Sequence, residues 1–109
     1  MKKHVDREVL AAASFYQKKY FINPKFINLP KDVQKELHLW VTTVAENIHG
    51  IFIIAFDQDG FLLFETMGEK NDFDYDHIGA GLEVTRLKRE QRELVEALQL
   101  WYSVYYSGV

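Results

Sequence analysis

The chain of 109 residues contains no cysteine. Disulfide bonds, thiolate metal ligands and cysteine nucleophiles are therefore excluded. No apolar run approaches the roughly 18 residues that a membrane-spanning helix needs. Asp6 and Glu8 also interrupt the N-terminal segment where a signal peptide would carry its apolar core. Together these absences predict a soluble, cytoplasmic protein.

Positive charge is not in excess, because the formal net charge at pH 7 is −3. Affinity for nucleic acid or for an anionic membrane depends on summed positive charge. The cations Arg86, Lys88, Arg89 and Arg92 do form a basic run, but glutamates interleave with them. We therefore expect neither nucleic acid nor membrane as a partner.

Motifs of common enzyme classes are missing as well. The sequence has no G-x-S-x-G nucleophile elbow, no Walker phosphate loop and no dinucleotide-binding glycine pattern. The four histidines, His4, His38, His49 and His77, are dispersed and show no H-x3-H or HExxH spacing. We predict no catalytic residue, no cofactor and no enzymatic activity.

What the chain does contain is typical of a folded globule. Apolar residues make up 48% of the sequence and aromatic residues 15%. There is no internal repeat, no low-complexity run and no linker long enough to divide the chain. The length is that of one hydrophobic core. We predict a single domain over residues 1–109.

The clearest element is a β-hairpin between Ile51 and Thr66, with the sequence IFIIAFDQDGFLLFET. Asp57 and Gly60 supply the side-chain turn bond and the positive φ that a tight loop needs. Alternating positions are apolar on both faces of the ribbon, and a two-stranded ribbon is marginally stable alone. Helices of the same chain, a second copy or a partner must therefore cover it.

Three helices are expected around this hairpin. Periodic apolar residues predict a first helix from about Val5 to Phe21 and, after a proline-containing connector over 22–30, a second helix that ends near Gly50. A heptad seam predicts a third helix from about Ile78 almost to the end. The fold class is α+β in the order helix, helix, β-hairpin, helix, with a small two-stranded antiparallel sheet that a dimer could extend.

An acidic loop over residues 69–83 is the candidate ligand site. Its carboxylates follow the spacing D-x-D-x-D-x6-E, which matches positions 1, 3, 5 and 12 of a calcium loop. The resemblance to an EF-hand fails on context, because His77 stands where the sharp turn needs glycine. The alternative interpretation is that Asp76 caps the third helix. The candidate metal ligands are Asp72, Asp74, Asp76, His77 and Glu83.

The C-terminal part of the third helix carries apolar and aromatic side chains at helical spacing. Such a cluster is more often core or subunit interface than a ligand platform. Together with the two-faced hairpin, it is more apolar surface than one short chain readily covers, which favours a homodimer. The predicted partner interface consists of Leu94, Leu98, Trp101, Tyr102 and Tyr105.

The segments PKFINLPKDVQKEL, HGIFIIAFDQDGFLLFE, DYDHIGAGLEV and LVEALQLWY together resemble a family of short bacterial proteins known only as a domain of unknown function. This resemblance spans nearly the whole chain and implies no catalytic residue. The segment GIFIIAFDQDGFLLFE followed by a helix is also similar to the opening hairpin of roadblock and longin-type regulatory domains, which pair into dimers through sheet and helix. That likeness covers under half the chain and concerns architecture only.

The function predicted from these observations is a non-enzymatic protein-interaction or regulatory module that acts as a homodimer, with a protein partner of unknown identity. The alternative is a small-ligand or divalent-metal-binding protein that uses the acidic loop over residues 69–83.

Overall fold

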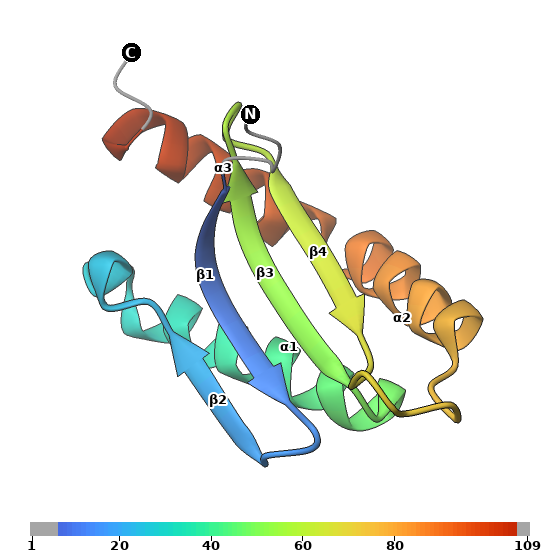
Figure 1. Cartoon of the computed structure of the whole chain (residues 1–109). Coiled ribbons are helices and arrows are strands. Elements are labelled where there is room, and N and C mark those ends of the chain that lie inside the picture. Colours follow the sequence, from blue (N-terminus) through green and yellow to red (C-terminus); the bar gives the residue numbers. More distant parts are fainter. Residues whose placement is uncertain (1–6, 107–109) are drawn as a thin grey trace, which may run out of the picture.

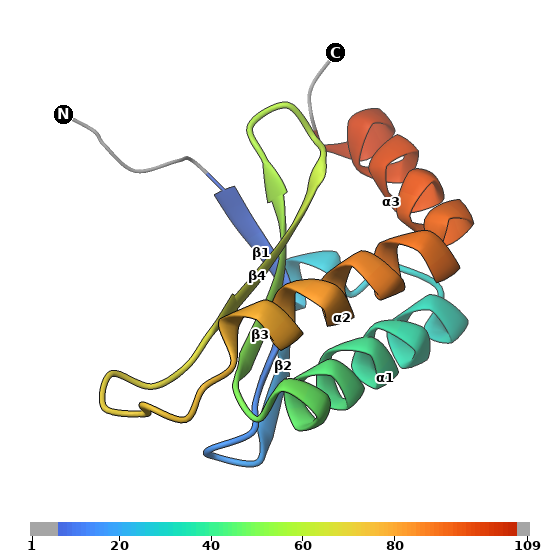
Figure 2. The ribbon, with the colours of Figure 1, turned by 90° about the vertical axis from the view of Figure 1, so that its right-hand side faces the viewer.

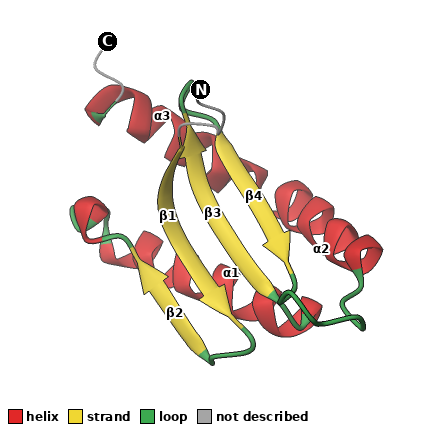
Figure 3. Ribbon diagram, in the orientation of Figure 1, coloured by secondary structure: helices red, strands yellow, loops and turns green. Residues whose placement is uncertain are grey.

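The computed structural model describes residues 7–106. Its strands form one antiparallel sheet in the order β2-β1-β3-β4 (Figures 1 and 3), so the fold is α+β. In chain order the elements are β1 (Arg7–Ser14), β2 (Lys19–Ile22), the 3-10 helix η1 (Pro24–Phe26), α1 (Lys31–Ile48), β3 (Ile51–Asp57), β4 (Leu62–Met67), α2 (His77–Glu90) and α3 (Arg92–Tyr105).

The three α-helices of the described chain all lie on one side of the sheet (Figure 2). α1 contacts β1, β2 and β3, while α2 contacts β4. The arrangement is a two-layer sandwich whose core lies between the helices and one face of the sheet. The largest fully buried side chains are Phe26, Phe52, Phe56, Leu10, Leu37, Ile54, Leu98 and Val41.

The predicted first helix is wrong, because this segment forms the β1–β2 hairpin and makes the sheet four-stranded. Its predicted start at Val5 lies outside the described residues. Alanine favours a helix in isolation, but Ala11 and Ala13 are buried in β1, which contacts both α1 and β3. Their small side chains let α1 lie close to the sheet, and this packing overrides the local preference. The turn to β2 contains Lys18 in the left-handed conformation, with φ 54°.

α1 follows Pro30 and ends at Ile48, close to the prediction. The positive φ expected at Gly50 is found one residue earlier, because His49 adopts the left-handed conformation with φ 54°. Glycine is needed at position 50 for space instead. A Cβ there would lie 2.6 Å from Cε1 of Tyr75 and 2.8 Å from the backbone oxygen of Met67.

The β3–β4 hairpin and its turn are confirmed. The Oδ1 atom of Asp57 accepts hydrogen bonds from the backbone N–H groups of Asp59 and Phe61 at 2.8 and 3.0 Å. Gly60 has a φ of 87°, as the tight loop requires. The turn chemistry read from the sequence therefore fixes this hairpin.

The predicted continuous third helix is two helices, because the backbone leaves helical geometry at Gln91, with φ −113° and ψ 26°. A straight helix over residues 77–105 would be roughly 43 Å long, as long as the longest dimension of the molecule, 43 Å. The break instead turns α3 across the end of the sheet (Figure 2). There the ring of Tyr102 stacks on Phe56 with centroids 4.0 Å apart.

Candidate functional site

The acidic loop and the start of α2 border a pocket of about 370 Å³ at the C-terminal end of α1. The structure brings together four of the five predicted metal ligands here, since Asp72, Asp74, Asp76 and Glu83 line this pocket. The ring of His77 packs edge-on against Tyr75, with centroids 4.7 Å apart. The candidate carboxylates are therefore neighbours, and their hydrogen bonds decide what they can do.

Asp76 is the N-cap of α2. Its Oδ1 atom accepts a hydrogen bond from the backbone N–H of Gly79 at 2.9 Å. This satisfies one of the backbone donors that the first helical turn leaves unpaired. The capping interpretation of Asp76 is confirmed.

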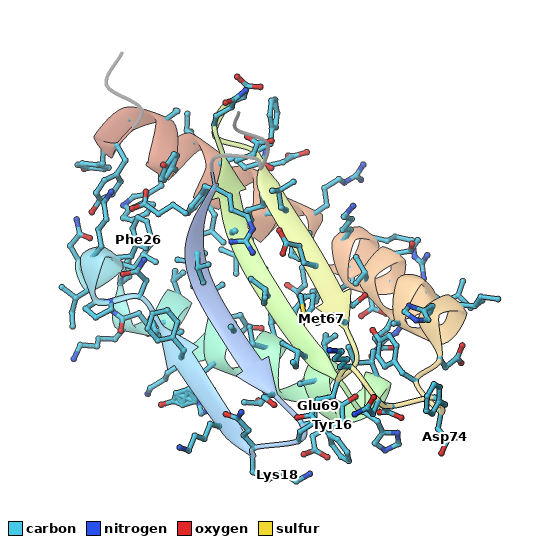
Figure 4. The ribbon with its side chains drawn as sticks, viewed as in Figure 1. Tyr16, Lys18, Phe26, Met67, Glu69 and Asp74 are labelled. Atoms are coloured by element: carbon cyan, nitrogen blue, oxygen red, sulfur yellow. The ribbon has the colours of Figure 1, made fainter. Side chains whose placement is uncertain are left out.

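Asp72 ties the acidic loop to the β1–β2 turn. Its Oδ2 atom accepts a hydrogen bond from the hydroxyl of Tyr16 at 2.6 Å, and the same hydroxyl accepts one from the backbone N–H of Glu69 at 3.1 Å. Figure 4 shows Tyr16 and Glu69 side by side at this end of the sheet. Burial and the hydrogen bond to Asp72 raise the pKa of the Tyr16 phenol.

Glu83 is engaged as well, because its Oε2 atom accepts hydrogen bonds from the side chains of Asn47 and Arg86. Asp72, Asp76 and Glu83 thus each hold part of the fold. Between residues 7 and 106, no group of three or more histidine, aspartate or glutamate side chains is arranged to hold a metal ion. The geometry of the pocket gives the metal hypothesis no support.

The predicted interface residues on α3 lie against the core to different degrees. Leu98 is 2% exposed, and Leu94, Trp101 and Tyr102 pack partly buried against the core. The Tyr102 hydroxyl lies 3.2 Å from Oε1 of Glu8, and burial raises the pKa of this phenol. Tyr105, by contrast, is 65% exposed. The assignment of these five residues to a partner interface stays a prediction. Leu98 itself is too deeply buried to contribute much contact area.

A second surface emerges on the sheet face away from the helices. In β3 the side chains of Phe52, Ile54 and Phe56 face the helices and are fully buried. Because side chains alternate along a strand, Ile51 and Ile53 point to the other side. Within the described chain no helix or strand covers that side (Figures 1 and 2).

We call this surface the open face. The pairing of the strands places its residues in rows, such as Phe21, Ala12, Ile53 and Glu65 across β2, β1, β3 and β4. Phe21 is 47% and Met67 is 40% exposed, and Met67 is labelled at the end of β4 in Figure 4. The apolar residues of the open face are Val9, Ala12, Phe21, Ile51, Ile53, Ala55, Leu63 and Met67.

One ion pair crosses the open face. Nε of Arg7 lies 2.8 Å from Oε2 of Glu65, and the two side chains are 33% and 29% exposed. The residue directly opposite Arg7 is Asp57, whose Oδ1 atom accepts hydrogen bonds in the hairpin turn. Arg7 instead reaches along the sheet to Glu65, which pairs with Ile53. The ion pair therefore crosses β3 at Ala55, whose small side chain has no exposed surface.

Comparison with known proteins identifies the family of this chain but no activity. A family model described as a family of unknown function, DUF6145, matches residues 7–109. The chain belongs to this family. The resemblance to an uncharacterised domain of unknown function is therefore confirmed. No curated protein and no solved structure matches the chain.

None of the helices described in this DUF6145 chain is long and apolar enough to cross a bilayer. The part of the open face that comes from β1 is missing from the sequence-based expectations, because the periodicity of that segment predicts a helix. The register shift between Val9 and Ala11 breaks the alternation, so that Val9 faces the open side while Ala11 and Ala13 face the helices, and no regular period of two marks this strand. The alanine run favours a helix instead.

Proposed function

We propose that this DUF6145 chain is a non-enzymatic protein-interaction module that acts as a homodimer through its open face. The observation that carries the proposal is the one-sided placement of the helices. All three cover the same side of the sheet, and the side left without a described covering element is apolar along β1, β3 and β4. A sheet face of this kind is normally packed on a second layer.

A second copy supplies that layer with the same surface. In an isologous dimer each chain contributes the same patch, so an apolar face in one chain meets an apolar face in the other. Association would remove water from partly exposed side chains such as Ile51, Ile53 and Leu63. Each square ångström of apolar surface buried in this way contributes about 25 cal/mol.

The acidic pocket supports a non-enzymatic role. Its carboxylates at Asp72, Asp76 and Glu83 accept hydrogen bonds that hold loops and helices in place. A cytoplasmic location and a further protein partner belong to the same proposal, the location because a chain without cysteine suits a reducing compartment.

The oligomeric state and the position of the interface can be tested together. The natural sequence has no cysteine, so single cysteines report unambiguously on one position. Met67→Cys places a thiol on the open face, where Met67 is 40% exposed, and Leu39→Cys places one on the outer surface of α1, where Leu39 is 58% exposed. We expect light scattering after size-exclusion chromatography to give the mass of two chains. A short bis-maleimide linker should then cross-link the Met67→Cys variant and leave the Leu39→Cys variant as single chains.

A single-chain mass at micromolar concentration would overturn the proposal. Equal cross-linking from both positions would also contradict it, since association would then not depend on the open face. Circular dichroism of both cysteine variants provides the control that each is folded.

A further inference from the structure

We infer that the Arg7–Glu65 ion pair determines how two copies of the chain pair, because each charge can bind its opposite in the partner copy. This inference rests on the homodimer proposed above and assigns a role to two residues that the apolar surface alone does not explain. It starts from the position of the pair on the open face, on β1 and β4.

The pair joins the first residue of β1 to the edge strand β4, and apolar side chains flank its carboxylate. Glu65 is opposite Ile53 and lies between Leu63 and Met67 on the same face of β4. Each side chain of the pair is about two-thirds buried already in the single chain. A second layer on this face would bury both charges further, so they must be paired in the assembly as well.

Both groups have capacity for a second partner. A guanidinium carries five N–H donors, and a carboxylate offers about four acceptor positions. The contact within the chain joins Nε of Arg7 to Oε2 of Glu65. Asp57, opposite Arg7 in the ladder, directs its Oδ1 atom to the β3–β4 turn, and we expect a partner copy to supply a second carboxylate for Arg7 on this face.

The charges also make the open face self-complementary. A surface that carries one sign repels its own copy across a two-fold axis, whereas a surface with both signs at separate positions can match itself. Arg7 on β1 and Glu65 on β4 provide the two signs on opposite sides of β3. Lys19, which pairs with Ser14 in the row of Ile51, adds one further positive charge at the far end of the face. The presence of both signs argues for a second copy of this chain as the occupant, in preference to a partner of one strong charge.

The size of the face makes such a determinant necessary. Four strands spaced about 4.8 Å apart and four to eight residues long form a surface of roughly 19 by 21 Å. That is about half of the roughly 800 Å² per partner that a standard specific interface buries. Apolar contact across a small, flat surface leaves orientation poorly defined, and charge pairing is the term that supplies specificity.

Charge reversal with mixing tests the inference. Arg7→Glu makes positions 7 and 65 both negative, and Glu65→Arg makes both positive. We expect each variant alone to lose at least ten-fold in dimer affinity, measured by sedimentation equilibrium. An equimolar mixture of the two should form a heterodimer near wild-type affinity, and native mass spectrometry identifies it because the two chains differ in mass. Lys35→Glu, on the exposed surface of α1, is the charge-matched control and should dimerise like the wild type.

Mixing separates pairing between copies from pairing within one chain, because an ion pair that acts only within a chain cannot be restored by another chain. If a reversal variant does not fold by circular dichroism, Arg7→Gln and Glu65→Gln replace it, and each should weaken the wild-type dimer several-fold. Unchanged affinity in the single variants, or a mixture that stays monomeric, overturns this inference while the homodimer stands. A monomeric wild-type chain overturns both.

Discussion

The two faces of the sheet are made from alternating residues of the same strands and are both apolar, yet only one is covered. In β3, Phe52 and Ile54 have no exposed surface, while their neighbours Ile51 and Ile53 are partly exposed. The two faces differ in exposure because the chain segments that connect or follow the strands, α1, α2 and α3, all pack on the same side of the sheet. Strand composition alone thus does not identify a core face, and the path of the chain decides which side becomes the core.

The largest effect should come from shortening a side chain on the covered face. Ile54→Ala removes three carbons from a fully buried position between β3 and the helices. The cavity and the lost burial should lower the free energy of unfolding by about 2–5 kcal/mol. Urea denaturation with fluorescence detection measures the loss. A change below about 1 kcal/mol would mean that the helices do not close this face as described.

An intermediate effect is expected where the loop before α2 closes the end of the covered face. In Gly50→Ala the new methyl group would meet the ring of Tyr75 and the backbone oxygen of Met67, both closer than 3 Å. Because one of these neighbours is backbone, relief requires movement of β4 or the loop, and we expect a loss of about 1–3 kcal/mol. Thermal unfolding checks this, with Gly81→Ala as control, since nothing lies within 4 Å of a Cβ there.

The smallest effect on folding should come from Ile53→Ala, the matched change on the open face. Ile53 is partly exposed in the single chain, so its truncation should cost about 1 kcal/mol or less when unfolding is measured at concentrations where the chain is monomeric. The same change should weaken the dimer more than ten-fold, because Ile53 lies in a central strand of the proposed interface. Equal losses of unfolding free energy in Ile53→Ala and Ile54→Ala would contradict the proposed difference between the two faces.

The sequence predicted the elements that local chemistry determines. Asp57 and Gly60 specify the turn between β3 and β4, and the apolar stripe of α1 needs no information from elsewhere in the chain. Asp76 was correctly identified as a helix cap. In each case the deciding contacts join residues close together in sequence.

What could not be predicted depends on contacts between distant residues. Ala11 and Ala13 form a strand because β3 pairs with them from beyond α1. The break at Gln91 has no glycine or proline to announce it, and it accompanies the stacking of Tyr102 in α3 on Phe56 in β3, which are distant in sequence. The spacing of the acidic residues suggested a cation, but Tyr16 and Asn47, from other elements, supply hydrogen bonds to Asp72 and Glu83.

The position of β1 inside the sheet, with β2 on one side and β3 on the other, has a consequence for how the chain reaches its native state. During synthesis β1 and β2 emerge before α1 and β3, so the ladder between β1 and β3 forms only after the whole of α1 and then β3 have emerged. Closing that long loop costs entropy before any native contact compensates for it. The first hairpin must therefore wait for β3, and the nascent chain carries exposed strand edges in the meantime.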